Sequence, residues 1–385
     1  MFCHSMTNSM GEIMKKDKLV FKSVLLTSAS FAGYNIGSGF ATGVEALQFF
    51  AAWGGKFAFS GIFLALLTSM AVLIAIYVIG FEQRFVKSSD VYHYFCGKYF
   101  GIVLDYYIYV SMIFVTFTMM SGAGATISQH SGLPAFAGAS IMGILCFVTA
   151  HLGLERLRKA LSYLCICTVL FVLFCGGYAF LTSGVSPIAG SANSEHYVSM
   201  GLMLRANTFG IQNPYLSGLS SAGLLIVSGF AWASATGSLC NSKREAVFSG
   251  IFSSLFFYMT TAVVVYLVLT SMDHVAGTEV PMLAVVHFLL PKLSVIYSII
   301  IILAIYSTIS GRLFLIAKRY DRGNKAMGFV IILSITILAI VGASLISFSK
   351  ISNVVFSIMG AVGIIVCIIV LTRFIIAETM PKQLL

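Results

Sequence analysis

Apolar runs long enough to cross a lipid bilayer follow one another along almost the whole chain, and this pattern limits what the chain can fold into. A helix of about 20 apolar residues spans the hydrocarbon core. The chain is 59% hydrophobic and only 9% charged, whereas a soluble domain carries about 25% charged residues. We therefore predict an all-α integral membrane protein with a single transmembrane domain.

The apolar runs divide the chain into ten predicted transmembrane helices. Their bounds are 21–52, 57–84, 99–128, 134–153, 158–183, 214–240, 246–271, 293–317, 326–347 and 352–376. The run from Pro281 to Leu290 is too short to span and is expected to lie at the surface or dip into the membrane. The predicted organisation is a tail at 1–20, a five-helix repeat at 21–183, an extracellular loop at 184–213, a second repeat at 214–376 and a tail at 377–385.

The positions of lysine and arginine support this topology. With the N-terminus inside, only Lys56, Arg205, Lys292 and Lys350 of the 23 basic residues fall outside, and the other 19, Arg312 among them, fall on the inner face. This asymmetry predicts a multi-pass protein of a bacterial cell membrane with both termini in the cytoplasm. It also explains the formal charge of +10 without nucleic-acid binding, since basic inner loops attract anionic lipid.

The first span contains the glycine-rich segment GYNIGSGFATG, from Gly33 to Gly43. One interpretation is close helix packing, because Gly33 and Gly37 are four residues apart, as are Gly39 and Gly43. The alternative is a broken helix near the membrane midplane. Its free amides would suit an anionic group, and its free carbonyls would suit a cation.

A transporter built from inverted repeats should carry a second broken helix at the matching place of its other half. The sixth predicted span has serine and glycine in its middle, at Ser228 and Gly229, and we expect it to be interrupted there. The eighth span places Ala304, Ser307 and Thr308 on one helix face. Its two hydroxyls either bond back to the preceding turn or face the break in the first span.

These motifs resemble the sodium-coupled transporters of the LeuT fold, within the amino acid, polyamine and organocation superfamily. The resemblance implies ten helices in a 5+5 inverted repeat, with helices 1 and 6 discontinuous. It implies a sodium ion held by the carbonyls of Gly33 and Ile36 and by Ala304, Ser307 and Thr308. Phe230 resembles the aromatic residue that closes over the substrate.

The chain also departs from that superfamily. Phe40 stands where the neurotransmitter-type branch has an asparagine, so we expect no second sodium site of that kind. The pattern GxGFATGxExxQFF in the first span is most similar to the YkvI-type amino acid permeases. That similarity does not define a substrate.

The expected function is sodium-coupled symport of a small amino acid or similar zwitterion by alternating access. The substrate carboxylate would meet the amides of Gly37, Ser38 and Gly39, and its amine the carbonyls around Ser228 and Gly229. A proton-coupled transporter or exchanger, and a ligand sensor that does not transport, are the alternatives. For the expected symporter, sodium is the coupling ion. We expect no cofactor.

Three further residues have a functional and a structural interpretation. Glu45 lies about 9 Å outward of the break by helical rise, where it could act as a gate or proton relay, or instead reach the interface or Gln48. Asp105 on the third span is a proton-relay candidate or the partner of Lys98. Trp232 either contacts substrate or packs.

Catalytic and metal-binding patterns are weak. Cys165 and Cys167 lack metal-pair spacing, the histidines form no HExxH pattern, and free thiols are expected. No Ser/His/Asp or paired-carboxylate arrangement occurs at membrane depth. We therefore predict that the protein is not an enzyme.

Overall fold

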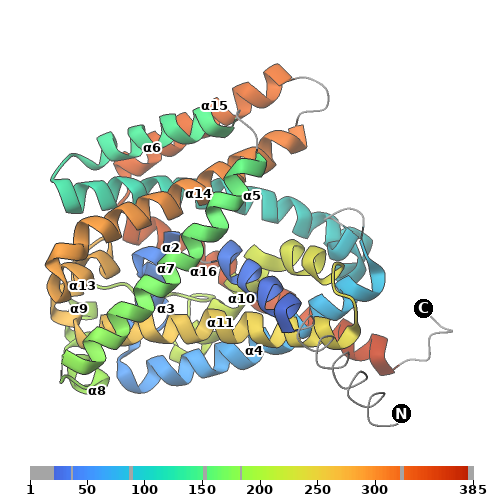
Figure 1. Cartoon of the computed structure of the whole chain (residues 1–385), viewed down its shortest axis with the longest axis horizontal. Helices are drawn as coiled ribbons and strands as arrows, with labels where there is room; N and C mark the ends of the chain where they lie inside the picture. Colours follow the sequence, from blue (N-terminus) through green and yellow to red (C-terminus); the bar gives the residue numbers. More distant parts are fainter. Residues whose placement is uncertain are drawn as a thin grey trace, which may run out of the picture.

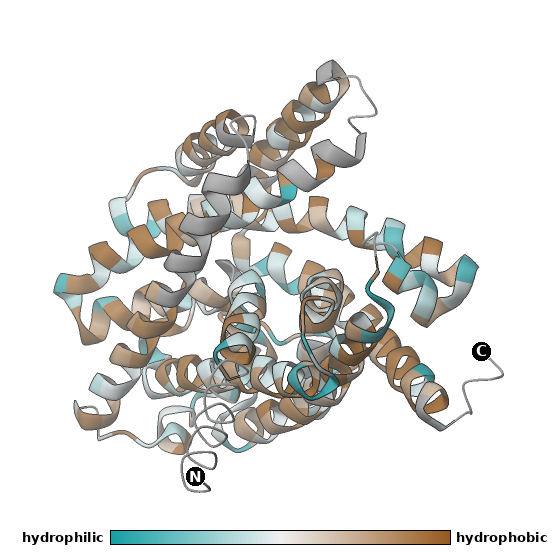
Figure 2. Ribbon diagram, turned by 45° about the vertical axis from the view of Figure 1, so that its right-hand side comes forward, coloured by the Kyte–Doolittle hydropathy of each residue, from teal (hydrophilic) through white to brown (hydrophobic). Residues whose placement is uncertain are grey.

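A computed structural model describes residues 21–35, 38–85, 90–150, 154–182, 184–320 and 325–379. Within these ranges the chain is almost entirely helical, and Thr208 and Ile211 form one isolated β-bridge. The long helices are apolar along much of their length, and the more polar residues gather at their ends and in the connections (Figure 2). The predicted all-α membrane class is therefore confirmed.

Residues 21–35 form the first described helix. The helices are α2 (Ser38–Thr42), α3 (Val44–Phe49), α4 (Gly55–Gln83), α5 (Asp90–Ser131), α6 (Ala135–Ala150), α7 (Leu154–Thr182), α8 (Pro187–Gly190), α9 (Ser194–Ser199), α10 (Pro214–Gly237), α11 (Lys243–Thr270), α12 (Met272–Val275), α13 (Pro281–Leu289), α14 (Ser294–Tyr320), α15 (Lys325–Leu345) and α16 (Phe348–Thr379), with 3-10 turns η1 (Ala51–Trp53) and η2 (Pro291–Leu293).

Six segments are long and apolar enough to cross a membrane: Gly55–Gln83, Asp90–Ser131, Pro214–Gly237, Lys243–Thr270, Pro291–Leu313 and Phe348–Ala377. The other four predicted spans also coincide with helices. Residues 21–52 contain the helix over 21–35 with α2 and α3, and the remaining three coincide with α6, α7 and α15. The apolar parts of α6 and α15, Ala135–Val148 and Met327–Ala343, are shorter than a full span. The total of ten spans stays a prediction.

The long helices fall into two groups that two other helices connect. In one group α4 packs against α10 and α11; in the other α5, α6, α14 and α15 pack against one another. Helix α7 contacts both α11 and α14, and α16 contacts α4, α5 and α10. Figure 1 shows α6 beside α15 at one end of the view and α4 beside α11 at the other.

The first predicted span is interrupted within the described residues. Helices α2 and α3 meet at Gly43, whose φ of 79° is left-handed. A side chain there would be strained and would also collide with Met282 of α13. The break expected from Asn35 to Gly39 includes residues 36 and 37, which lie outside the described ranges.

The sixth predicted span is not interrupted at Ser228 and Gly229, so that expectation was wrong. Helix α10 runs without a break from Pro214 to Gly237. The Ser228 hydroxyl oxygen lies 2.9 and 3.1 Å from the carbonyl oxygens of Leu224 and Leu225 in the preceding turn. The small residues of α10 therefore do not mark a break in the helix, and they allow neighbouring helices to pack against it.

The glycines of α10 allow neighbouring backbones to approach closely. A Cβ on Gly218 would lie 2.6 Å from the carbonyl oxygen of Gly61 in α4, and one on Gly223 would lie 2.5 Å from that of Gly360 in α16. Close helix packing through small residues, which the sequence suggested for the first span, therefore occurs in α10, the sixth predicted span.

The connection between α7 and α10 packs against the end of the first predicted span. Arg205 in this connection donates from Nε to the Ala52 carbonyl at 2.9 Å, and its guanidinium lies 4.5 Å from the ring centre of Trp53. The Ala206 amide donates to the Gln48 carbonyl at 2.9 Å. These contacts hold the connection against the C-terminal end of the interrupted first span.

We predict that Gly223→Ala destabilises the protein by about 1–3 kcal/mol, because its new methyl group meets backbone atoms of α16 that cannot move aside. Thermal unfolding in detergent measures the change. Gly177→Ala is the matched control, since no atom lies within 4 Å of a Cβ at that helical position. Equal melting temperatures for the two variants would contradict the close crossing of α10 and α16.

Candidate functional site

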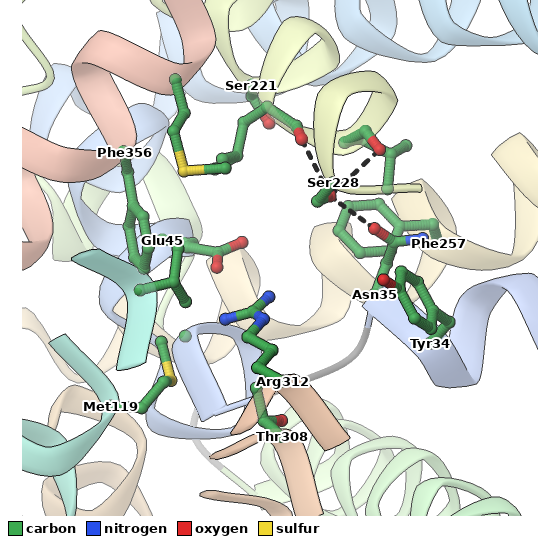
Figure 3. A pocket seen from close by; sticks show the side chains of 15 residues that line it. Tyr34, Asn35, Glu45, Met119, Ser221, Ser228, Phe257, Thr308, Arg312 and Phe356 are labelled. Atoms are coloured by element: carbon green, nitrogen blue, oxygen red, sulfur yellow. Dashed lines mark hydrogen bonds between the residues drawn. The ribbon is translucent and has the colours of Figure 1, made fainter. Parts of the chain in front are cut away.

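A small cavity lies between the first span, α5, α10, α11, α14 and α16 (Figure 3). Its volume is about 50 Å³, and one water molecule needs roughly 10–15 Å³ measured in this way. The cavity therefore holds a few waters or a small group in this conformation. Its lining consists of Tyr34, Asn35, Gly39, Glu45, Val115, Met119, Ser221, Leu224, Leu225, Ser228, Phe257, Thr308, Arg312, Phe356 and Met359.

A hydrogen bond between the two halves of the chain forms part of the wall. The Ser228 hydroxyl donates to Oδ1 of Asn35 at 2.6 Å, and Nδ2 of Asn35 donates to the Phe31 carbonyl at 3.1 Å. Gly229 permits this approach, because a Cβ there would lie 2.7 Å from Nδ2 of Asn35. The end of the first helix is thus fixed against the middle of α10.

Two opposite charges enter the cavity from different sides. Glu45 comes from α3, after the bend at Gly43, and Arg312 comes from α14. Figure 3 shows the guanidinium of Arg312 pointing toward the carboxylate of Glu45. Charged side chains at membrane depth are rare and usually line functional cavities.

Arg312 is the charged lining residue that the sequence prediction did not assign to the site. Its place near the end of the eighth span assigned it to the inner face, but its side chain lines the cavity instead. The signal was present, because Ala304, Thr308 and Arg312 are spaced by four residues and so share one helix face.

Glycine at position 39 makes room for the acid. A Cβ on Gly39 would overlap Oε1 of Glu45. The carboxylate therefore rests directly on the backbone of α2. Gly39 was predicted to bind substrate through its amide, and the structure places it in the cavity lining.

The predicted sodium ligands are described in part. Ser307 and Thr308 both donate to the carbonyl of Ala304, at 2.8 and 2.9 Å, which is the back-bonding that the sequence allowed. Thr308 also lines the cavity. Gly33 belongs to the helix over 21–35, whereas Ile36 lies outside the described residues. The sodium site stays a prediction.

The remaining predicted substrate residues lie in different places. Ser228 lines the cavity and Gly229 lies beside Asn35. Phe230 is buried outside the lining, with its ring centre 5.4 Å from that of Tyr92. Gly37 lies outside the described residues, and only the backbone of Ser38 is described.

Trp232 lies beside the cavity, next to one of its walls. Its ring stacks on Tyr34, with centres 5.0 Å apart and planes 7° apart. The indole nitrogen is buried and has no hydrogen-bond partner within the described part of the chain. Trp232 thus packs on a lining residue without belonging to the lining.

Asp105, predicted as a possible proton relay, is not in the cavity. It lies on α5, ten residues before the lining residue Val115. Across the described ranges, three or more His, Cys, Asp or Glu side chains do not gather as a metal-binding group. Six cysteines are free thiols, namely Cys96, Cys146, Cys167, Cys175, Cys240 and Cys367.

Comparison with known proteins gives one relative by sequence, and no family model matches the chain. The chain is 22% identical over 339 residues to the uncharacterized membrane protein YkvI of Bacillus subtilis, covering 87% of this chain and 91% of that protein. This sequence similarity extends over nearly the full length of both proteins.

Solved structures of the Eremococcus coleocola manganese transporter are also similar. A complex with an aromatic bis-isothiourea substituted compound is 14% identical, with a TM-score of 0.45, covering 91% of this chain and 71% of that one. A mutant form is 15% identical, with a TM-score of 0.44, covering 89% and 70%.

We predict that Gly39→Ala leaves the melting temperature nearly unchanged but moves the Glu45 carboxylate. The new methyl group meets only the far end of a flexible side chain, which can turn away. Binding of any ligand that needs this carboxylate should weaken at least tenfold, as measured by calorimetric titration. Unchanged affinity in a well-folded variant would contradict the position of Glu45.

Proposed function

We propose that the protein is a secondary transporter for a small zwitterion of the amino acid class. The observation that carries this proposal is the buried polar cavity, which residues from both halves of the chain line together. Transporters of inverted-repeat architecture bind substrate near the midplane, at the interface of the repeats. The bacterial cell membrane, with both chain termini in the cytoplasm, is the proposed location.

The way in which helices pair supports alternating access. Helix α4 packs against α11, α5 against α14 and α6 against α15. These are the second and seventh, third and eighth, and fourth and ninth of the predicted spans. Matching helices from the two halves are therefore neighbours, and a rocking motion of one helix group against the other would open the cavity to either side.

Sodium is the proposed coupling ion. Ser307 and Thr308 use their hydrogens to bond the Ala304 carbonyl, but each hydroxyl oxygen keeps lone pairs for a cation. With the carbonyls of Gly33 and Ile36 they would supply the oxygen ligands that a hard cation prefers. Binding there would link the first span to α14.

One observation favours proton coupling or exchange as a second candidate. Glu45 is the one acidic residue of the cavity lining, and gaining or losing a proton would change its interaction with substrate. Transport driven by a pH gradient in the absence of sodium would support this candidate. Asp105, the other predicted proton-relay candidate, lies outside the lining.

We predict that sodium raises the melting temperature of the purified wild type more than potassium does, and that Ser307→Ala/Thr308→Ala removes the difference. A ligand that binds only the folded state must stabilise it. Ser298→Ala is the control, because this hydroxyl on the same helix bonds back to Val295 and is not part of the lining. Equal responses to both ions in the wild type would rule out the proposed ion site.

Uptake into proteoliposomes tests transport itself. We expect accumulation of at least one radiolabelled neutral amino acid under an inward sodium gradient, with Asn35→Ala lowering the rate because it removes the contact with Ser228. Binding without uptake or exchange in either direction would instead indicate a sensor. Empty liposomes and a protein-loaded sample without a gradient are the controls.

A further inference from the structure

The cavity contains two charges that do not neutralise each other directly. The charged groups of Glu45 and Arg312 are not within the 4.0 Å of an ion pair, although both residues are described and both line the cavity. Nη1 of Arg312 is buried and has no hydrogen-bond partner among the described residues. An uncompensated buried charge is strongly destabilising, so a partner is expected for each group.

We propose that Glu45 and Arg312 recognise the two ends of an amino acid. The substrate carboxylate binds the guanidinium of Arg312, and the substrate ammonium binds the carboxylate of Glu45. This inference rests on the proposed function and assigns its substrate contacts to side chains. A zwitterion suits the site because it brings one charge of each sign and leaves the net charge of the cavity unchanged.

The shape of helix α10 supports side-chain recognition of the ammonium group. The sequence predicted that carbonyls freed by a break around Ser228 and Gly229 would receive the amine. Because α10 is continuous there, those carbonyls remain within its hydrogen-bonding ladder. Glu45 is the charged acceptor that the lining offers in their place.

The guanidinium suits the other end of the ligand. Arginine donates in a planar fork that matches a carboxylate with two parallel hydrogen bonds. The hydroxyls of Ser221, Ser228 and Thr308 line the same cavity. The oxygens of Ser228 and Thr308 keep lone pairs that can accept hydrogens of the substrate ammonium group, because their own hydrogens are already donated.

The rest of the lining defines the class of side chain. Seven apolar side chains line the cavity beside the two charges: Val115, Met119, Leu224, Leu225, Phe257, Phe356 and Met359. Among the described residues of the lining, Glu45 and Arg312 are the only charged ones. In the proposed complex, the ammonium and the carboxylate of the substrate pair with both of them. A second charge on the ligand would be buried without a partner, so the site selects a small neutral amino acid.

Binding measurements with matched ligands test this inference. L-alanine, L-valine and L-leucine are each compared with the amine that lacks the carboxylate and the acid that lacks the amine. At least one amino acid should bind the wild type about 30-fold or more tightly than either analogue, because each analogue leaves one buried charge unpaired. Equal binding of an amino acid and one of its analogues would overturn the proposal.

Glu45→Gln and Arg312→Gln assign the contacts. Each should weaken amino acid binding about 30-fold or more, and each should reduce the preference for the group that its residue recognises: Arg312→Gln for the carboxylate, Glu45→Gln for the ammonium. Glu82→Gln and Arg244→Gln are the matched controls, since Glu82 pairs with Lys243 at 3.3 Å and Arg244 lies over Phe248, both outside the lining. These controls should bind as the wild type does.

A double variant shows whether a loss of binding in the single variants comes from misfolding. Glu45→Gln/Arg312→Gln removes both charges, so its melting temperature without ligand should equal or exceed that of the wild type, while amino acid binding is lost. A well-folded double variant with wild-type affinity would overturn the proposal.

Failure of this inference and failure of the proposed function are distinguishable. If the wild type takes up an amino acid while the charge variants retain full uptake and affinity, the inference is wrong and the transport function stands. If the wild type neither binds nor moves any neutral amino acid, the proposed function is wrong, and the assignment of substrate charges fails with it.

Discussion

Hydrocarbon offers no hydrogen-bond partners, so each polar group between these helices must be satisfied by the protein or by a ligand. Many of the described serines and threonines meet this constraint by bonding back to their own helix, as Ser307 and Thr308 do. Asn35 and Ser228 meet it across the two halves of the chain. Glu45 and Arg312 form no ion pair with each other, and both line the cavity between the first span, α10 and α14.

Close packing of the helices elsewhere offsets the free-energy cost of this cavity. Glycine-to-backbone contacts hold the N-terminal half of α10 close to both α4 and α16. The first span is held differently, through its bend at Gly43 and the contacts of the Arg205 connection with η1. A continuous helix thus faces an interrupted one across the site. Movement of the first span relative to α10 would alter the cavity most directly.

The sequence predicted the helices well because each long apolar run has only one way to satisfy its backbone in a membrane. It failed at the middle of α10, where glycine and serine suit both a broken helix and a tightly packed one. Local pattern does not distinguish these outcomes, since the close contacts of Gly229 are with Phe31 and Asn35, far away in the chain. Thr308 and Gly39 were predicted for the site, but Arg312 was missed, because charge counting assigns an arginine near a span end to the surface. The packing of α14 against its neighbours places the Arg312 side chain in the cavity.

The central claim is that a solute crosses the membrane through the cavity between Glu45 and Arg312. Thiol labelling of Ser221→Cys in a cysteine-free background tests it, because Ser221 lines the cavity. The account predicts that a membrane-impermeant maleimide labels this position from the outside in right-side-out vesicles and from the inside in inverted ones, and that a transported amino acid slows labelling. Labelling from one side only, at a rate that no amino acid changes, would contradict it.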